Sequence, residues 1–267
     1  MIAVCLKLTA HPGHADDDAR FAGVSLADRA ALEVALRLAA ACDDQVLAVS
    51  VGPAAAAHVL REALACGAGD AVHIEQPPGG DSRDVARELA EALRGARAVV
   101  CGDHSLDRGS GSVPAFVAHH LGAAQGLGLV DVITAEGSTV NGVHAVRRVD
   151  GGRREVLRVG FPCVLSVEGS AATLRRASLR NALAGTTGAV QHRVGAPPRH
   201  APPPTLVAPF RPRPRAMAAP TSTDVLERLR LLTDAIGAPA RGETVELPPR
   251  AAAERIIAAL RSWGYVE

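Results

Sequence analysis

The stretch A-V-R-R-V-D-G-G-R-R-E-V-L-R-V-G-F-P-C-V-L-S at residues 145–166 decides how the second half of this 267-residue chain is built. Two β-like runs, each carrying arginines, flank the sequence Asp150-Gly151-Gly152. Asp-Gly between alternating runs predicts a tight hairpin turn, because glycine tolerates the positive φ that such a turn requires. After Pro162 the chain is apolar from Cys163 to Val167, which predicts a strand.

The first 121 residues alternate between short apolar runs and longer amphipathic segments. The apolar runs predict strands at residues 2–8, 45–51, 72–74 and 98–101. Helices are expected after Ser25, at about 53–66, from Asp81 or Ser82 through Leu93, and at 113–121. Strands that alternate with helices form right-handed βαβ units around a parallel sheet. The sequence therefore predicts an α/β fold, a Rossmann-like parallel sheet with an antiparallel hairpin extension.

The C-terminal part has a different composition. Residues 195–220 are rich in proline, which excludes regular helix and central strand and favours an extended chain. Helices are expected at 223–236 and 250–263. We expect a nucleotide-binding α/β domain at 1–194, and at 195–267 a Pro-rich arm with C-terminal helices that contact a partner subunit. The alternative is a tail with little role.

Composition limits the possible functions. Apolar residues make up 48% of the chain and aromatic residues 2%, so the core must be built from Ala, Val and Leu. The net charge of +1 argues against a nucleic-acid partner, and no apolar segment is long enough for membrane insertion. The five cysteines contain no C-x-x-C pair, so we expect no metal site and free thiols in a reducing cytoplasm. The protein is therefore expected to be cytoplasmic.

A ligand crevice is expected at the carboxyl ends of the strands, where the strand order reverses. If that order is 3-2-1-4-5, Cys5 and Lys7 at the end of the first strand face the loop 102–112 after the fourth. Glycine amides, serine hydroxyls, Arg108 and a helix N-terminus in this loop would form a phosphate cradle for a nucleotide. A flexible turn would explain the glycines equally well.

Several motifs together resemble the beta subunit of electron transfer flavoprotein. The hairpin signature comprises Arg147, Asp150, Gly151, Gly152, Glu155, Leu157, Pro162, Val164 and Leu165, with Ser166 where the family has Thr, Ala or Cys. Further landmarks are Ser25-Leu-Ala-Asp28, Val49-Ser-Val-Gly-Pro53, the run 60–68, the loop 102–112 and Gln125. The resemblance covers residues 1 to about 190.

The resemblance implies a non-catalytic subunit of a heterodimeric electron carrier. The alpha subunit of that family holds most of the FAD, and the heterodimer passes electrons from a dehydrogenase to an acceptor. The beta subunit holds a structural AMP, or a second FAD in some members. Carried over by position, the nucleotide contacts are Cys5, Ser25, Leu26, Ala27, Asp28, Val51, Gly102, Ser105, Asp107, Arg108, Gly109, Ser110, Gly111, Ser112 and Val113. Leu179 would dock the dehydrogenase; the alternative is that Leu179 is an ordinary buried residue.

Departures from the family pattern indicate a divergent member. Asp103-His104 replaces Lys-Gln, Ser25-Leu26 replaces Asn-Pro, and the docking region lacks the family's Leu-Asn-Glu-Pro-Arg-Tyr. The branch associated with the redox cofactor mycofactocin is a candidate. Two other functions compete with the electron carrier. One is a nucleotide-dependent hydrolase or ligase that uses His104, Asp107, His119 or His120, and the other is a nucleotide-sensing module resembling universal stress proteins.

Overall fold

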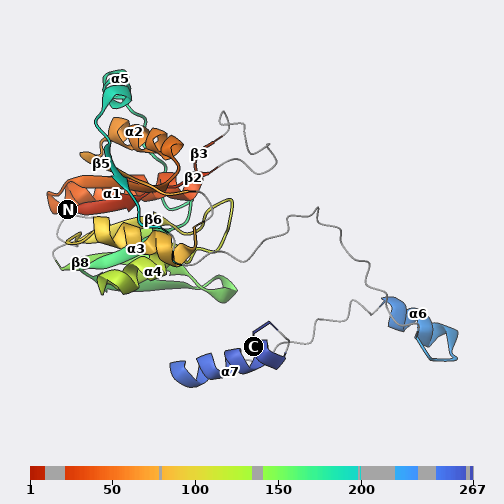
Figure 1. The fold of residues 1–267 in the computed structure, drawn as a ribbon. Helices are drawn as coiled ribbons and strands as arrows, with labels where there is room; N and C mark the ends of the chain where they lie inside the picture. The colour runs from red at the N-terminus through yellow and green to blue at the C-terminus, as the bar shows by residue number, and fades with distance from the viewer. Residues whose placement is uncertain are drawn as a thin grey trace. The chain divides into compact units, whose positions relative to one another are not determined.

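The computed structural model describes residues 1–9, 22–77, 80–133, 141–197, 199, 220–233, 245–262 and 265–266. The chain divides into two compact units, Met1–Leu206 and Val207–Glu267. Figure 1 shows the first unit as a layered domain built on a central sheet. The functional boundary expected at residue 194 stays a prediction.

A parallel sheet forms the centre of the first unit. Its five central strands are β5 (Asp70–Glu75), β4 (Val46–Gly52), β1 (Ile2–Cys5), β6 (Ala98–Gly102) and β10 (Cys163–Val167), in that spatial order. All neighbouring pairs among them run parallel. The predicted α/β fold class is confirmed, and the strands expected first to fourth along the chain lie in the expected order 3-2-1-4.

Helices cover both faces of this sheet (Figure 1). On one face lie α1 (Leu26–Cys42) and α2 (Ala57–Cys66), the latter after a 3-10 turn at Ala54–Ala56; on the other lie α3 (Ser82–Ala92) and α4 (Val113–Leu121). Successive residues of β1 point to opposite faces, so Ile2 and Val4 pack under α1 while Ala3 and Cys5 pack under α3 and α4. The expected helix at 113–121 is confirmed to the residue.

The antiparallel extension is also confirmed, with one difference in strand order. Strands β7 (Ala124–Ile133), β8 (Gly142–Arg148) and β9 (Arg154–Gly160) pair in antiparallel fashion, and Gly151 and Gly152 in the hairpin turn have φ of 72° and 74°. Strand β10 follows the hairpin along the chain but inserts between β6 and β7, parallel to both. The fifth strand beside β6 is therefore contributed from beyond the hairpin, which no local pattern indicates.

Three short strands were not predicted. The first strand ends at Cys5, and β2 (Leu8–Thr9) pairs with β3 (Gly23–Val24) in a separate ladder. Strand β11 (Gln191–Val194) adds to the edge of the main sheet, parallel to β5. All four of its side chains are exposed, so β11 has no apolar alternation by which its sequence would reveal it.

The C-terminal unit contains two described helices. They are α6 (Val225–Thr233) and α7 (Pro249–Ser262), shorter than or offset by one residue from the predicted 223–236 and 250–263. Residues 234–236 and Trp263 lie outside the described residues, as does most of the Pro-rich stretch. Across the described part of the chain, no helix combines the length and the apolar character that crossing a bilayer demands.

An ion pair between a buried carboxylate and a half-exposed arginine ties the chain after β10 to helix α1. Glu33 is 5% exposed and accepts hydrogen bonds from the backbone N, Nε and Nη2 of Arg175 at 3.1, 2.9 and 3.0 Å. Burial raises the pKa of the Glu33 carboxyl, but these hydrogen bonds and those from Arg37 outweigh it, so the pKa lies below its usual value of 4.5. Arg175 lies shortly before α5 (Leu179–Thr187), so this pair anchors the segment that leads into that helix.

We expect Glu33→Gln to lower the free energy of unfolding by about 2 kcal/mol at pH 7, because it weakens charged hydrogen bonds to a buried carboxylate, while the half-exposed Arg175 side chain can still be solvated. A carboxyl whose folded pKa is depressed stabilises the protein above its unfolded pKa, and this stabilisation disappears as pH falls through the folded pKa. Urea unfolding at a series of pH values from 7 to 3 should therefore show the free energies of unfolding of the wild type and Glu33→Gln becoming closer as the pH falls.

Glu254→Gln is the matched control, since Glu254 forms an exposed pair with Arg250 on α7. It should change the free energy of unfolding by less than about 0.5 kcal/mol. A wild-type advantage over Glu33→Gln that is as large at pH 3 as at pH 7 would contradict the electrostatic explanation.

Candidate functional site

A cavity lies at the carboxyl ends of the central strands, where a ligand crevice was expected. Its volume is about 280 Å³. Residues 5–8 at the end of β1 form one wall, and most of the residues from the end of β6 to Pro114 form another. Strands β1 and β6 are neighbours in the sheet, and the strand order runs outward from this pair in opposite directions. The pair therefore marks the topological switch point of an open α/β sheet.

A buried carboxylate joins the two strand ends beneath this cavity. The Ser25 hydroxyl caps α1 by accepting a hydrogen bond from the backbone N of Asp28 at 3.0 Å, which places Asp28 in the first turn. The Asp28 carboxylate accepts the backbone N–H of Lys7 at 3.0 Å and that of Gly102. A Cβ on Gly102 would lie 2.5 Å from Asp28 Oδ1, so only glycine leaves room for this contact.

Burial dominates the electrostatics of Asp28. It raises the pKa of the carboxyl to about 6 from 3.8, against the hydrogen bonds from Lys7 and Gly102 and the charge of Lys7, which all lower it. Asp28 therefore changes its charge close to neutral pH, while its side chain is only 8% exposed.

Specific hydrogen bonds shape the loop that follows β6. The backbone N–H of Asp103 donates to Val167 O at 3.0 Å, and that of Gly109 donates to Ser105 O at 2.8 Å. Gly111 has a φ of +59°, and a Cβ there would lie 2.5 Å from Asp103 O. The backbone of Gly111 thus adopts a conformation that other residues rarely adopt, and the loop folds back on Asp103. This defined geometry favours a phosphate cradle over a flexible turn as the reason for the glycines.

The loop leads into the N-terminus of α4. Ser112 at the N-cap makes no side-chain hydrogen bond to the first turn of this helix; its hydroxyl lies 3.1 Å from that of Ser110. The amide end of α4 therefore has no capping side chain within the described residues, and its partial positive charge faces the cavity. Such an end suits an anion.

Two cations line the cavity. Lys7 Nζ, the only lysine amine in the sequence, forms an ion pair with Asp107 Oδ2 at 2.6 Å. Arg108 donates from Nη1 to Gly80 O at 2.6 Å, which joins the loop to the start of α3. Burial raises the pKa of Asp107, but the hydrogen bonds from Lys7 and Ser105 and the charge of Lys7 outweigh it, so the pKa lies below 3.8 and the carboxylate is ionised at neutral pH.

The structure brings together most of the predicted nucleotide contacts. Those that line the cavity are Cys5, Asp28, Val51, Gly102, Ser105, Asp107, Arg108, Ser110, Gly111, Ser112 and Val113. Four others do not line it: Ser25 is the buried cap of α1, Ala27 is buried against Gly102, Leu26 is 73% exposed, and Gly109 lies in the turn that closes on Ser105. Whether any of these residues binds a nucleotide stays a prediction.

A further wall of the cavity was not predicted. It comes from the end of β5 and the start of α3, through Gln76, Pro77, Gly80, Ser82, Val85 and Leu89. The rule that ligands bind beyond the carboxyl ends of parallel strands would have indicated Gln76, which directly follows β5. Val85 and Leu89 are ordinary core-facing helix residues, so nothing in their sequence distinguishes them.

The candidate catalytic side chains are divided between the cavity, which His104 and Asp107 line, and the exposed surface of α4, which carries His119 and His120. A hydrogen bond with Cys5 and burial raise the pKa of the Cys101 thiol, which keeps it protonated and poorly nucleophilic. His104 lines the cavity with Nδ1 2.8 Å from Asp103, but His119 and His120 are exposed on α4. No cluster of three or more metal-ligating residues exists within the described ranges.

Leu179 occupies the outer surface of α5. Ser178 caps this helix by accepting the backbone N–H of Asn181 at 3.1 Å, so the helix begins at Leu179. Leu179 is 77% exposed and Leu183, one turn later, is 63% exposed. The alternative that Leu179 is a buried core residue is therefore wrong. On its inner side α5 packs closely on α2, because a Cβ on Gly185 would lie 2.9 Å from that of Ala65.

Comparisons with known proteins all point to one family. The profile of the electron transfer flavoprotein domain matches residues 17–194. The chain is 30% identical over 262 residues to the electron transfer flavoprotein subunit beta of Chromohalobacter salexigens, in a match that covers 95% of this chain and 89% of that protein.

Other relatives match over a shorter region. The electron transfer flavoprotein subunit beta of Mycobacterium tuberculosis is 32% identical over 171 residues, which are 60% of this chain and 62% of that protein. Protein FixA of Rhizobium meliloti is 30% identical over 165 residues, which are 58% of this chain and 56% of FixA. The chain thus matches less than two thirds of the length of these two relatives.

The raised pKa of Asp28 predicts a distinctive pH dependence. A carboxyl whose folded pKa exceeds its unfolded value of 3.8 stabilises the protein below that value, and the stabilisation is lost as pH rises through about 6. We expect the wild type to lose roughly 3 kcal/mol relative to Asp28→Asn between pH 3.5 and pH 7. Urea unfolding of both proteins at half-unit steps measures this difference.

Asp70→Asn, at the exposed start of β5, is the matched control. Its free energy of unfolding should differ from that of the wild type by the same amount at every pH in this range. If Asp28→Asn also kept a constant difference across this pH range, the assigned titration of Asp28 would be wrong.

Proposed function

This chain belongs to the electron transfer flavoprotein beta-subunit family, and from that premise we propose that it is the non-catalytic beta subunit of a heterodimeric electron carrier. An alpha-type subunit holds most of the FAD. A dehydrogenase supplies the electrons, and a separate acceptor receives them. The beta subunit contributes a rigid base, a nucleotide site and a docking surface for the donor.

The observation that carries this proposal is the cavity at the switch point. It combines an anion-binding helix end, two cations and an apolar wall, but no assembled nucleophile or metal cluster within the described residues. Such a site suits an anionic ligand that is held without reacting, which supports a non-catalytic role. Its volume of about 280 Å³ is at the small end of ligand sites, which span about 300–1,000 Å³. A mononucleotide such as AMP therefore fits better than a complete FAD.

Each wall of the cavity has a distinct task in holding AMP. Ser110, Gly111 and the N-terminus of α4 would hold the phosphate, together with the charges of Lys7 and Arg108. The apolar side chains of Val51, Val85 and Leu89 would cover the base. Asp28 holds the two strand ends together beneath the ligand and does not itself need to contact it.

The FAD, when bound, would supply the redox chemistry. The residues of this chain position the partner that carries it. This division of labour would leave the beta subunit to bind and position its partners rather than to catalyse a reaction.

The outer face of α5 supports a docking role for Leu179. Leu179 and Leu183 form an exposed apolar ridge on a helix that Gly185 seats firmly on α2. Arg176 and Arg180 are exposed beside it, and the sequence contains no Asp or Glu from 169 to 223. A donor with an apolar socket bordered by carboxylates would complement this surface.

Co-expression with the alpha-type subunit of the same organism should yield a yellow heterodimer. Denaturation should release FAD and AMP, identified by chromatography and mass spectrometry. Lys7→Ala combined with Arg108→Ala should lower AMP occupancy at least about ten-fold while FAD stays bound, since it removes both cavity cations.

Arg94→Ala removes an exposed arginine at the end of α3, away from the cavity, and is the matched control with full AMP occupancy. A colourless monomer that hydrolyses a nucleotide would instead favour the enzyme alternative.

Leu179→Ala should raise the KM for the donor dehydrogenase about ten-fold or more, because a central apolar anchor contributes about 2 kcal/mol or more to a docked interface. The readout is reduction of the heterodimer, followed by flavin absorbance, with kcat largely unchanged.

Val156→Ala truncates a 69% exposed apolar side chain on β9 and serves as the control for surface hydrophobicity. Equal KM values for the two variants would show that α5 is not the docking surface.

A further inference from the structure

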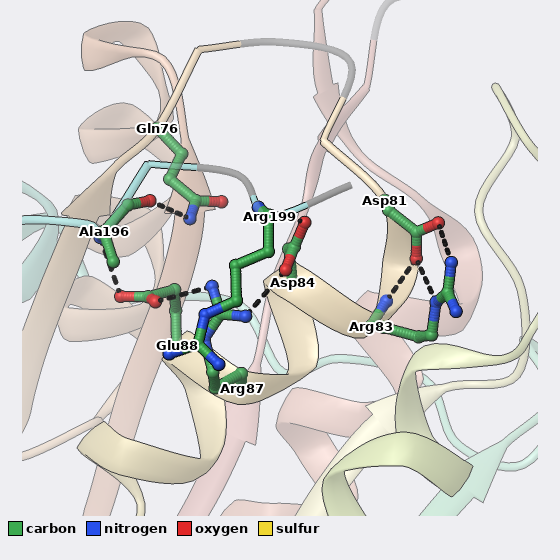
Figure 2. Close-up of polar contacts among 8 residues, drawn as sticks. All are labelled: Gln76, Asp81, Arg83, Asp84, Arg87, Glu88, Ala196 and Arg199. Carbon is green, nitrogen blue, oxygen red and sulfur yellow. Dashed lines mark hydrogen bonds and ion pairs between the residues drawn. The ribbon is translucent and has the colours of Figure 1, made fainter. Parts of the chain in front are cut away.

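Buried carboxylates hold the segment where the chain leaves the main sheet. After β11, the backbone N–H of Gly195 donates to Glu75 O at 2.9 Å and continues the edge of the sheet. The next two amide groups donate to side chains of α3: Ala196 N to Glu88 Oε2 at 3.2 Å, and Arg199 N to Asp84 Oδ2 at 3.0 Å (Figure 2).

These two contacts use every amide donor that this short segment has. Residues 197 and 198 are prolines and carry no N–H, so Ala196 and Arg199 supply the only backbone donors between 196 and 199. Both donors point at a carboxylate of α3. Asp84 and Glu88 lie one helical turn apart on α3. The two amide donors, separated by the two prolines, are spaced so that each reaches one of these carboxylates.

The carboxylates themselves are enclosed. Asp84 is fully buried and Glu88 is 8% exposed. Arg87 bridges their other oxygens, with Nη1 at 2.7 Å from Asp84 Oδ1 and Nη2 at 3.5 Å from Glu88 Oε1. Burial of two carboxylates is unfavourable unless their oxygens are hydrogen-bonded, and the backbone donors of 196 and 199 meet that requirement.

The same segment contacts the cavity wall. Gln76 lines the cavity and donates from Nε2 to Ala196 O at 3.2 Å. A Cβ on Gly195 would lie 2.7 Å from Gln76 Cγ, so glycine is needed for this close approach. None of residues 195–197 or 199 lines the cavity, so the segment supports the wall from outside.

We propose that Asp84 and Glu88 are positioning residues that fix the place and direction in which the C-terminal segment leaves the α/β domain. The segment would then start from a defined point before the partner subunit arrives, which reduces the conformational entropy lost on association. The partner in this inference rests on the proposed function, whereas the fixed exit can be tested on the chain alone.

Limited trypsin digestion of the full-length chain tests the fixed exit, because the bond after Arg199 lies directly beyond the carboxylate contacts. Asp84→Asn with Glu88→Gln should accelerate cleavage there about ten-fold or more, since each amide group would replace a charged acceptor oxygen by a donor. Ala196→Pro removes the donor to Glu88 and leaves α3 unchanged, so it should accelerate the same cleavage even if the double variant folds poorly.

Glu91→Gln neutralises an exposed carboxylate on α3 and is the matched control; it should leave the cleavage rate unchanged. Cleavage after Arg215 is the internal reference for protease activity. Equal rates after Arg199 in the wild type and in Ala196→Pro would overturn the proposal.

The dissociation constant for the alpha-type subunit supplies the functional readout. Ala196→Pro should weaken association about ten-fold, while the thermal midpoint and the AMP content stay at wild-type values. Faster cleavage with unchanged partner affinity would overturn the positioning role. A wild-type chain that binds no alpha-type subunit would overturn the proposed function and the role of the segment in association, but not the fixed exit. Equal cleavage rates after Arg199 with intact partner binding would overturn only the role assigned to Asp84 and Glu88.

Discussion

The architecture of the site depends on the buried carboxylate of Asp28. It accepts backbone amides from the ends of β1 and β6, two segments almost a hundred residues apart, and thereby holds the two sides of the switch point together. The contact is possible only because Ser25 starts α1 at the right residue and Gly102 has no side chain. The cavity, the loop that closes it and the amide end of α4 are all arranged around this point.

Features with a local cause could be predicted from the sequence. Apolar runs indicated the strands around Val49 and Val100, and the loop before Val113 indicated where α4 begins. The Asp-Gly-Gly sequence indicated the hairpin turn, in which both glycines have positive φ. The parallel order of the first four strands follows from right-handed βαβ connections. The cavity residues at the strand ends could be predicted for the same reason, since chain topology alone brings them together.

Features that depend on contacts between distant segments could not be predicted. The insertion of β10 between β6 and β7 and the exposed edge strand β11 leave no periodic pattern in the sequence. The pairing of Glu33 with Arg175 spans 142 positions, and the contact of Asp84 with the amide of Arg199 spans 115. In the sequence of a helix, Glu33 and Asp84 resemble surface residues. Only the folded structure shows that both are buried and that backbone N–H groups from the second half of the chain donate hydrogen bonds to their carboxylates.

The solitary ε-amino group of this chain has a chemical consequence. Lys7 is the only lysine, and it lies at the mouth of the cavity in an ion pair with Asp107. An acetyl donor or any other acylating agent that targets lysine side chains therefore has a single place to react. Acylation there would cancel the cation and leave the aspartate as an uncompensated negative charge facing an anion site, so one covalent event would turn an attractive entrance into a repulsive one.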